Sequence, residues 1–366
     1  MMSSRCFSSV FLPSFHSLSQ KDMVTPRNTT KNSKVYLMWR GMPLVWLFMP
    51  KNLLEISDPN GRLANQSLTF VFMTRSIFFL LVLGFAACQP PTSDTWTGTS
   101  YTDLVLTDGT GTLYIIGGGS RPLSLMEGVV RRLPSKDALV LVMPMASSEP
   151  DTSLYYGVKP LEALGCTNVH GMHVESATVS DAQLDSIRNA AGFYLCGGDQ
   201  ARFMAVAEGA VADAIREAFR RGAIVSGSSA GAAMMSRVMI TGDQRQEPEY
   251  ESTYRRLVAE NGVYLEGLGL LDQAIIDQHF VERSRYNRAL TALHDYPGLP
   301  VFGIGESTAL VVEPSGLSVE GEGQVVVFEA SSTRADSAGR IGLQDVHLNV
   351  WLPGESITPK AGSRLP

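Results

Sequence analysis

Short apolar runs separated by amphipathic stretches dominate the chain from Gly111 onward. Continuous apolar runs of this length are typical of strands buried on both faces of a parallel sheet. They comprise Thr112–Ile116, Ala138–Met145, Gly192–Cys196 and Ala223–Ser226. The stretches between them have helical periodicity: Asp181–Ala191 follows a Ser cap, and Ala201–Arg221 has the pattern of one long amphipathic helix. This alternation predicts an α/β fold with a doubly wound, mostly parallel sheet that helices cover on both faces.

Three apolar segments near the C-terminus depart from this pattern, because Gly-rich turns separate them instead of helices. They are Ala309–Glu313, Val325–Glu329 and Val346–Leu352. Strands that are joined by short turns pair antiparallel. We therefore expect antiparallel strands at one edge of the main sheet, within a single catalytic domain over residues 111–355 that a tail over residues 356–366 follows.

An apolar stretch upstream of this domain has the features of an export signal. A short segment with one basic residue, Arg75, precedes Ile77–Ala87, which is an uninterrupted run of apolar or small residues. The run is too short to span a bilayer but fits the hydrophobic part of a signal peptide. Small residues before Cys88, and a polar Pro/Ser segment after it, resemble a bacterial lipoprotein signal.

The lipoprotein resemblance implies an organisation for the N-terminal part. Residues 73–88 would be the signal, Cys88 would be lipidated, and residues 89–110 would be a Thr/Ser/Pro linker. The protein would then be exported to the cell envelope and attached to the membrane by lipid alone. Residues 1–72 would precede the true start; the alternative is a real N-terminal extension that contacts a membrane through Leu44–Met49. For the signal itself, the alternative is a buried helix next to a chance cysteine.

Composition and charge exclude several classes of function. Hydrophobic residues make up 44% and charged residues 18% of the chain, which is typical of a globular protein. Residues 1–72 hold 8 basic and 3 acidic residues, a net charge of +5, whereas residues 88–366 hold 21 basic and 33 acidic residues, a net charge of −12. Such an acidic domain lacks the basic face of a nucleic-acid-binding protein, and four Cys are too few for a disulfide scaffold.

The sequence carries no cofactor or metal motif. Gly117-Gly118-Gly119 follows a predicted strand but lacks the G-x-G-x-x-G spacing and the acidic ribose partner of a dinucleotide site. We expect these glycines to permit close backbone approach at the rim of the active site. Cys166 and Cys196 have no metal-ligand spacing and are expected to be buried thiols. We therefore expect no cofactor and no metal.

A candidate nucleophile lies where a predicted strand turns into a helix. Gly227-Ser228-Ser229-Ala230-Gly231 fits the G-x-S-x-G pattern, with an apolar strand before it and small residues after it. In this pattern a sharp turn lifts the serine hydroxyl out of the sheet, and the glycines keep side chains away from the turn. The N-terminus of the following helix directs backbone N–H groups at developing negative charge. A small-residue turn that packs closely on a neighbouring helix is the alternative.

A serine nucleophile needs a base and a group that orients the base. His279 follows a short apolar strand, whereas His294 and His347 have the pattern of surface or packing residues. Glu306 also follows an apolar strand, and a carboxylate there is costly unless it is paired. Ser229, His279 and Glu306 thus all come at carboxyl ends of predicted strands, where a doubly wound sheet places its active site. Their order differs from the Ser…Asp/Glu…His order of α/β-hydrolases.

Four motifs resemble those of the cyanophycinases, which are serine peptidases of family S51 in the dipeptidase E group. The motifs are Gly197–Gln200 (GGDQ), Gly227–Ala232 (GSSAGA), Asp277–Phe280 (DQHF) and Gly303–Leu310 (GIGESTAL). The resemblance covers roughly residues 111–355 and implies a flavodoxin-like fold of the class I glutamine amidotransferase type. It also implies catalysis without a cofactor, and dimers occur in the family.

The resemblance assigns roles to individual residues. Ser229 would be the nucleophile, His279 the general base and then acid, and Glu306 the group that orients the imidazole. Backbone N–H groups of Ala230 and of Gly197 or Gly198 would hold the oxyanion of the tetrahedral intermediate. The substrate-binding positions would be Gln200, Asp277, Gln278, Arg283, Arg285, Arg288 and Ser307.

The implied substrates are peptides or polymers with β-linked aspartyl residues. Cyanophycinases degrade a poly-aspartate polymer that bears arginine to β-aspartyl-arginine, and Arg side chains suit bidentate capture of carboxylates. Arginines on helices are, however, usually solvated. Gly305-Glu306-Ser307 departs from the family's Asp-Glu-Asn, so a general isoaspartyl or α-aspartyl dipeptidase is an alternative. A non-catalytic binding module on the same scaffold is another, and a glutamine amidotransferase would need Cys in place of Ser229.

Overall fold

The computed structural model describes residues 35–37, 45–47, 111–175, 179–247, 249 and 251–357. The chain forms two compact units, Met1–Thr92 and Ser93–Pro366. In the first unit, β1 (Val35–Leu37) pairs antiparallel with β2 (Val45–Leu47). Among the described residues, no helix has the length and apolar character needed to cross a bilayer.

Several predictions for the N-terminal part fall outside the described residues. These are the signal over residues 73–88 with its lipidated Cys88, and the linker over residues 89–110. Most of the predicted tail, from residue 358 onward, also lies outside them. These assignments therefore stay predictions.

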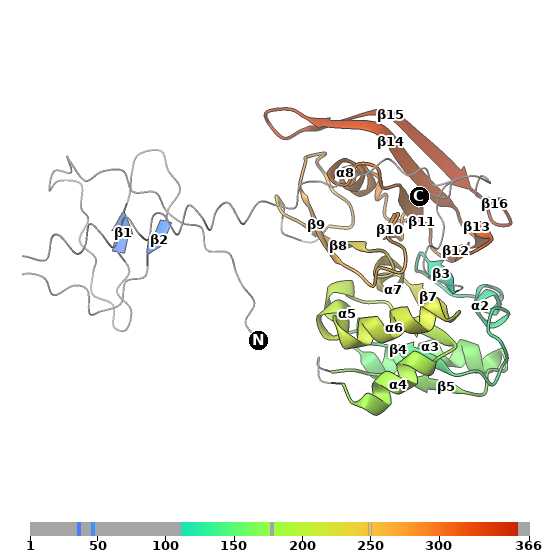
Figure 1. Ribbon diagram of the computed structural model, residues 1–366. Coiled ribbons are helices and arrows are strands. Elements are labelled where there is room, and N and C mark those ends of the chain that lie inside the picture. The colour runs from blue at the N-terminus through green and yellow to red at the C-terminus, as the bar shows by residue number, and fades with distance from the viewer. Residues whose placement is uncertain are drawn as a thin grey trace, which may run out of the picture. The chain divides into compact units, whose positions relative to one another are not determined.

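The main sheet of the second unit has eight strands. They are β3 (Thr112–Ile116), β4 (Val140–Met143), β5 (Val169–Gly171), β6 (Gly192–Leu195), β7 (Ile224–Ser228), β12 (Thr308–Glu313), β13 (Gly316–Gly321) and β16 (Ser356–Ile357). Their order is β16-β13-β12-β3-β7-β6-β4-β5 (Figure 1). The strands from β3 to β5 in this order run parallel, and β12, β13 and β16 extend the sheet antiparallel. The predicted mostly parallel sheet with antiparallel edge strands is confirmed.

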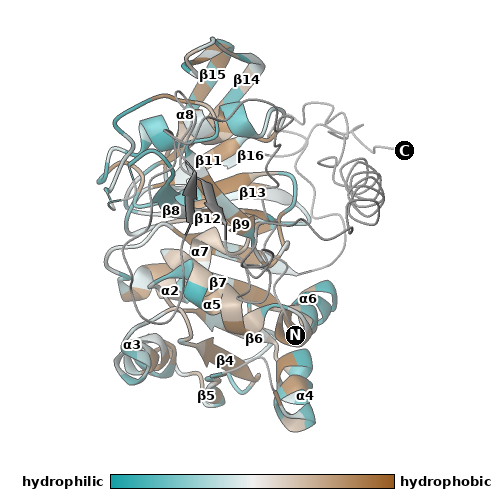
Figure 2. Cartoon of the chain, turned by 90° about the vertical axis from the view of Figure 1, so that its left-hand side faces the viewer, coloured by the Kyte–Doolittle hydropathy of each residue, from teal (hydrophilic) through white to brown (hydrophobic). Residues whose placement is uncertain are grey.

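Helices cover both faces of this sheet because its strands are apolar on both sides. On one face Tyr114 and Ile116 pack with α2 (Leu123–Val130) and α3 (Pro150–Ala163). On the other face Leu113 and Ile115 belong to the cluster that includes residues of α4 (Asp181–Asn189), α5 (Gln200–Ala207) and α6 (Ala210–Arg220). Alternate residues of one strand thus supply the two faces. Helix α6 shows both hydrophilic and hydrophobic colours in Figure 2, as expected for a helix with one buried side.

One predicted helix is two helices in the structure. The segment predicted as a single helix over Ala201–Arg221 breaks between α5 and α6, where Gly209 has φ 87 and ψ −123. This conformation lies outside the helical region and is open to glycine at little cost. By contrast, the predicted helix after Ser180 is confirmed, since Ser180 and Gln183 form a reciprocal capping box at the start of α4.

Several strands that were predicted for the main sheet form a second sheet instead. It comprises β10 (Ile275–Gln278), β11 (Val301–Ile304), β14 (Val325–Ala335) and β15 (Ile341–Trp351), in the order β10-β11-β14-β15. Strands β10 and β11 are parallel, whereas β14 and β15 pair antiparallel. The strands that precede His279 and Glu306 therefore do not belong to the main sheet. Of the late apolar segments, only Ala309–Glu313 forms part of the predicted antiparallel edge.

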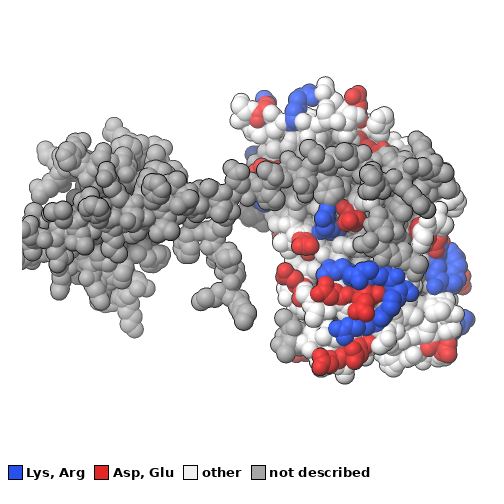
Figure 3. Space-filling view, viewed as in Figure 1, with Lys and Arg blue, Asp and Glu red and all other residues white. Residues whose placement is uncertain are grey.

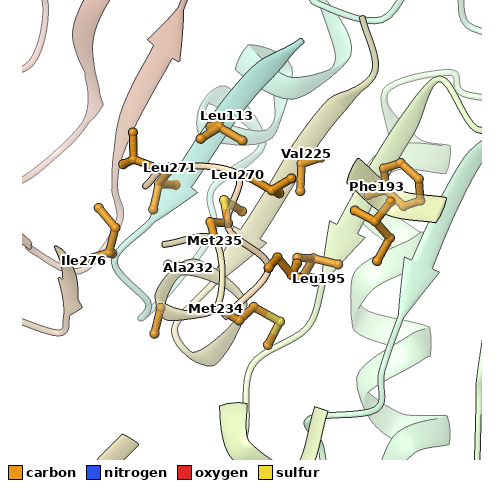
Figure 4. Packing of buried hydrophobic residues seen from close by; sticks show 14 of the residues in the cluster. Leu113, Phe193, Leu195, Val225, Ala232, Met234, Met235, Leu270, Leu271 and Ile276 are labelled. Atoms are coloured by element: carbon orange, nitrogen blue, oxygen red, sulfur yellow. The ribbon is translucent and has the colours of Figure 1, made fainter. Parts of the chain in front are cut away.

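The two sheets share one hydrophobic core. A single buried cluster contains Leu113 and Val225 of the main sheet together with Ile276 and Phe302 of the second sheet. Figure 4 shows how the short helix α7 (Ala230–Ala233) and the methionines after it pack between strands of the two sheets. Common burial of this kind fixes β10 and β11 against β7, and this positions the residues at their ends.

Charged side chains on the outer faces of α4 and α6 form neutralising pairs. Arg188 contacts Asp185 and Glu217, and Arg221 contacts Glu217. Figure 3 shows basic and acidic side chains lying next to one another in this region. Arg188 and Arg221 thus have acidic partners close by.

Candidate active site

Three side chains from the ends of three strands form a chain of hydrogen bonds. Ser229 follows β7, His279 follows β10, and Glu306 comes two residues after β11. Ser229 Oγ lies 2.8 Å from His279 Nε2, and His279 Nδ1 lies 2.5 Å from Glu306 Oε1. A hydroxyl, an imidazole and a carboxylate in this sequence can move a proton away from the hydroxyl and stabilise the resulting imidazolium.

Ser229 lies at a strained turn. Its φ of 58 and ψ of −113 are rare for a residue with a side chain. The turn needs the flanking glycines, because a Cβ on Gly227 would lie 2.5 Å from the carbonyl oxygen of Gly231, and a Cβ on Gly231 would overlap the carbonyl oxygen of Leu195. The helix that follows, α7, has only four residues, so its individual N–H groups matter here more than the helix dipole predicted from the sequence.

Three consecutive carbonyl groups, of the last residue of β3 and the two residues after it, hold the three segments that carry these side chains. Each accepts a hydrogen bond from a backbone N–H at or next to one member of the triad. The pairs are Ile116 with Ser229 at 3.0 Å, Gly117 with His279 at 2.7 Å, and Gly118 with Ser307 at 2.9 Å. One short loop thus sets the relative positions of strand ends that come from two sheets.

The glycines of this loop lie directly against the side chains of the triad. A Cβ on Gly118 would overlap the imidazole of His279, and a Cβ on Gly119 would lie 2.6 Å from Glu306 Oε2. The predicted close backbone approach at the rim of the site is confirmed. His279 and Ser307 also have positive φ, of 48 and 52, so the backbone is strained at or next to each member of the triad.

The surroundings of His279 favour its neutral form. Burial lowers the pKa of the imidazole, and the nearby Arg283 cation lowers it further, while the hydrogen bond to Glu306 acts in the opposite direction. The net shift of the pKa is downward from the usual value of 6.5. A neutral imidazole can accept a proton from Ser229 at neutral pH.

The residues predicted to form the oxyanion hole lie around Ser229. A Cβ on Gly197 would lie 3.4 Å from Cβ and 4.0 Å from Oγ of Ser229. Gly198 has a φ of 138, and Ala230 is the first residue of α7. The N–H of Ser229 itself donates to Ile116, so it is engaged within the protein.

Four of the predicted substrate-binding residues are buried and bonded to each other. Asp277, Gln278, Arg285 and Arg288 are each no more than 6% exposed. Arg288 binds both carboxylate oxygens of Asp277, through Nε at 2.8 Å and through Nη2. Arg285 Nη1 donates to the carbonyl oxygen of Gln278 at 2.6 Å and to its side-chain oxygen. This differs from the predicted capture of a substrate carboxylate, because the guanidinium of Arg288 already holds a carboxylate inside the protein. The alternative of a solvated Arg face is also excluded for these two arginines.

The other predicted substrate-binding residues have different surroundings. Gln200 is 5% exposed, and its amide nitrogen donates to the carbonyl oxygens of Ile240 and Thr241. Ser307 Oγ lies 3.0 Å from both the carbonyl oxygen and Oγ of Ser120. Arg283 is half-buried and close enough to His279 to lower its pKa. Among these residues, Arg283 is therefore the one placed to act on the triad.

Sequence reasoning missed Arg121, which follows the Gly-rich loop. Its guanidinium lies 5.6 Å from the centre of the buried Tyr194 ring, and burial raises the pKa of that phenol to about 12. The available signal was a cation two residues after the Gly run, with Ser120 between them. Within the described residues, Cys166 and Cys196 are buried free thiols, as predicted, and no group of three His, Cys, Asp or Glu could hold a metal ion.

A Ser–His–Glu chain of hydrogen bonds at the carboxyl ends of β7, β10 and β11, which come from the two sheets of an α/β fold, is an arrangement typical of hydrolases. Comparison with known proteins identifies the family. Residues 113–319 match peptidase family S51, and the chain therefore belongs to this family and is a peptidase.

Characterised relatives and a solved structure agree with this assignment. The chain is 29% identical to a cyanophycinase of Nostoc sp. over 239 residues, which cover 63% of this chain and 78% of the relative. It is 30% identical to a cyanophycinase of Synechococcus elongatus over 230 residues, which cover 60% and 68%. The crystal structure of a peptidase from an acI-B1 Actinobacterium superposes with a TM-score of 0.51 at 20% identity, over 69% of this chain and 98% of that one. This last likeness bears on the fold alone.

Proposed function

We propose that the protein is a serine peptidase that cleaves β-linked aspartyl peptides through an acyl-enzyme. The observation that carries this proposal is the continuous contact from Ser229 through His279 to Glu306, at 2.8 and 2.5 Å. The substrate class follows from the similarity to cyanophycinases. From the sequence alone, we also propose that Cys88 attaches the peptidase to the cell envelope.

In the proposed reaction, His279 Nε2 accepts the proton of Ser229 Oγ as this oxygen attacks the scissile carbonyl carbon. The carbonyl oxygen becomes an oxyanion that accepts hydrogen bonds from the N–H of Ala230 and from one N–H of the Gly197-Gly198 turn. His279 then donates its proton to the leaving amine as the C–N bond breaks. Water, deprotonated by His279, hydrolyses the ester and regenerates Ser229. Throughout, Glu306 accepts a hydrogen bond from Nδ1–H and stabilises the imidazolium.

A second candidate is a general isoaspartyl or α-aspartyl dipeptidase. The observation in its favour lies beside the acid of the triad. Gly305 has no side chain, and the hydroxyl of Ser307 is bonded to Ser120. Neither position offers a side chain that is free to select arginine. A non-catalytic binding module is disfavoured, because strained backbone is retained around an assembled triad.

The test is a panel of substrates with the full chain. Cyanophycin, β-Asp-Arg, β-Asp-Leu and α-Asp-Leu peptides are incubated with the wild-type protein, with Ser229→Ala, and with Ser186→Ala on the exposed face of α4 as the matched control. We expect cleavage of cyanophycin with release of β-Asp-Arg, and a loss of at least about 10³-fold in Ser229→Ala. Unchanged turnover in that variant would remove the mechanism. Cleavage of all the dipeptides at similar rates supports the dipeptidase, and binding without cleavage supports the binding module.

A further inference from the structure

Arg121 is a half-buried cation at the rim of the proposed active site. Its guanidinium lies 5.6 Å from the centre of the ring of Tyr194, which is buried in β6. No carboxylate within the described part of the chain forms an ion pair with Arg121, whereas Arg132 and Arg288 each contact an acidic side chain. A partly desolvated cation is costly unless a partner neutralises it. The position of Arg121 is therefore suited to binding an anion.

The backbone that leads to Arg121 is fixed to the triad. Two residues before it, a Cβ on Gly119 would lie 2.6 Å from Glu306 Oε2. One residue before it, the carbonyl oxygen and Oγ of Ser120 both lie 3.0 Å from Ser307 Oγ. Consecutive Cα atoms are about 3.8 Å apart, so the Cα of Arg121 lies within about 8 Å of the Cα of Gly119. The side chain thus starts from a loop that contacts the acid of the triad.

The guanidinium end of Arg121 lies beside the nucleophile and the oxyanion turn. Burial raises the pKa of the Tyr194 phenol and of the Cys196 thiol, and the Arg121 cation acts against this rise at both groups. Cys196 directly precedes Gly197, where a Cβ would lie 3.4 Å from Cβ of Ser229. In the main sheet, β7 lies between β3 and β6. Arg121 therefore reaches from the loop after β3 across the end of β7, which carries the nucleophile, to the end of β6.

Arg121 and His279 reach the nucleophile from opposite faces of the main sheet. Tyr194 belongs to the buried cluster on the face that α2 and α3 cover. His279 follows β10 of the second sheet, which packs on the other face, because Ile276 of β10 belongs to the cluster of that face. In the proposed reaction His279 donates a proton to the leaving amine, so the leaving part of the substrate lies on its side. The acyl part then extends towards Arg121.

We infer that Arg121 is a specificity-determining residue that pairs with a carboxylate on the acyl side of the scissile bond. The inference rests on the proposed function and concerns a single group of the substrate. Pairs of guanidinium and carboxylate are charge-assisted and can be bidentate. Stacking on the buried Tyr194 ring restricts the side chain before the substrate binds. Arg121 thus selects for negative charge on the part of the substrate that is transferred to Ser229.

The experiment compares substrates that differ by one carboxylate. Two substrates cover the two candidate functions: a cyanophycin segment of two β-Asp-Arg units, and a β-Asp-Leu dipeptide. In each, the carboxylate on the acyl side is either free or converted to a carboxamide, which has nearly the same shape but no charge. A third form carries the carboxamide on the leaving side instead. This form shows whether loss of any one charge has the same effect.

Values of kcat and KM are measured with the full chain for the wild type, Arg121→Gln and Arg121→Lys. Dissociation constants are measured by calorimetry in a Ser229→Ala background. Arg220→Gln removes the same charge from the exposed end of α6 and is the matched control. The acyl-side amide is a second control, because it lacks the group that Arg121 binds and reports any general damage to the site.

We expect the wild type to prefer the free acid over the acyl-side amide by about 10-fold or more in kcat/KM. Arg121→Gln should abolish this preference and cleave the amide as the wild type does, whereas Arg121→Lys should keep part of the preference. The leaving-side form should respond equally in all variants. If Arg121→Gln keeps the preference, or lowers the turnover of acid and amide alike, the inference is overturned and the proposed function stands. If the folded wild type neither binds nor cleaves either substrate, both proposals fall.

Discussion

Two members of the proposed triad, and the residue next to the third, have a strained backbone. Ser229, His279 and Ser307 all have positive φ, and each is tied to a successive carbonyl group of the loop after β3. Such strain persists only where the surroundings fix the conformation. The loop of Ile116 to Gly118 thus acts as a positioning element for the triad, although none of its side chains reacts.

The first prediction concerns Gly118, whose Cα faces the imidazole of His279. The Gly118→Ala methyl group would overlap that ring and displace it. A misplacement of about 1 Å can cost about 10²-fold in rate, so we expect kcat to fall by about that factor while KM changes little. Steady-state kinetics on a β-aspartyl peptide measure this. An unaltered kcat in a folded Gly118→Ala protein would show that the loop does not position the base.

The second prediction concerns the pH dependence of activity. Because the pKa of His279 is lowered, and because the neutral imidazole is the active base, the acid limb of kcat/KM should lie below the usual pKa of histidine. Arg283→Gln removes a cation that lowers this pKa. The pKa should therefore rise and the acid limb should move to higher pH. Arg340→Gln, on an exposed pair with Asp336, is the control that should leave the pH profile in place.

At the scale of elements, the break between α5 and α6 shows how one residue divides a continuous helical pattern. A periodic apolar face runs through both helices, so sequence periodicity alone predicts one helix. The break depends on the conformation of Gly209, and a glycine within a helical pattern is tolerated often enough to be an ambiguous signal.

The third prediction follows from this break. A Cβ on Gly209 meets nothing within 4 Å, but its φ of 87 is strained for any other residue. Gly209→Ala should therefore lower the free energy of unfolding by about 1–3 kcal/mol, with kcat and KM unchanged. Urea unfolding measures the loss. A stabilised variant would indicate that the segment can continue as one helix.

The fourth prediction concerns the ion pair that joins β10 to α8 (Tyr286–Asp295). Asp277 and Arg288 are 1% and 2% exposed, so Asp277→Ala removes the carboxylate that pairs with a buried cation. Loss of one partner of a buried pair typically costs about 3–5 kcal/mol, which urea unfolding of the substrate-free protein would detect. Arg340→Ala, which breaks the exposed pair with Asp336 and keeps the backbone hydrogen bonds that Asp336 accepts, should cost at most about 1 kcal/mol. If Asp277→Ala instead changed KM without changing stability, direct contact with substrate would be supported.

At the scale of the whole molecule, the two sheets of the second unit depend on each other. Ile276 and Phe302 of the second sheet pack in the same buried cluster as Leu113 and Val225 of the main sheet. When either sheet unfolds, the apolar surface of the other sheet is exposed to water, and both sheets lose the stabilisation that this burial provides. The triad is assembled across these layers, so its geometry depends on the shared core.

The fifth prediction is that the two sheets unfold together. Hydrogen exchange should give backbone amides of β6 and β10 the same free energy of opening, because neither sheet keeps its core without the other. Leu195→Ala, in the part of the shared cluster supplied by β6, should lower both values equally. Protection that falls in β6 but not in β10 would show that the sheets are separate cooperative units.

The sequence by itself determined the local features of this protein. Apolar runs located the strands, Gly227-Ser228-Ser229-Ala230-Gly231 located the turn, and polar residues after strands identified His279 and Glu306. Local pattern was sufficient for these features, because the burial of a strand and the conformation of a tight turn leave their mark on neighbouring residues.

Only the tertiary structure decided which strands share a sheet and which side chains meet. It placed β10 and β11 in a second sheet, buried Arg285 and Arg288 against polar partners, and brought the carbonyl groups after β3 to the triad. These contacts join segments that are distant in the chain. For the buried arginines, the outcome also depends on which polar group lies next to each charge in the folded protein. Such contacts arise from the packing of the common core, which local periodicity does not encode.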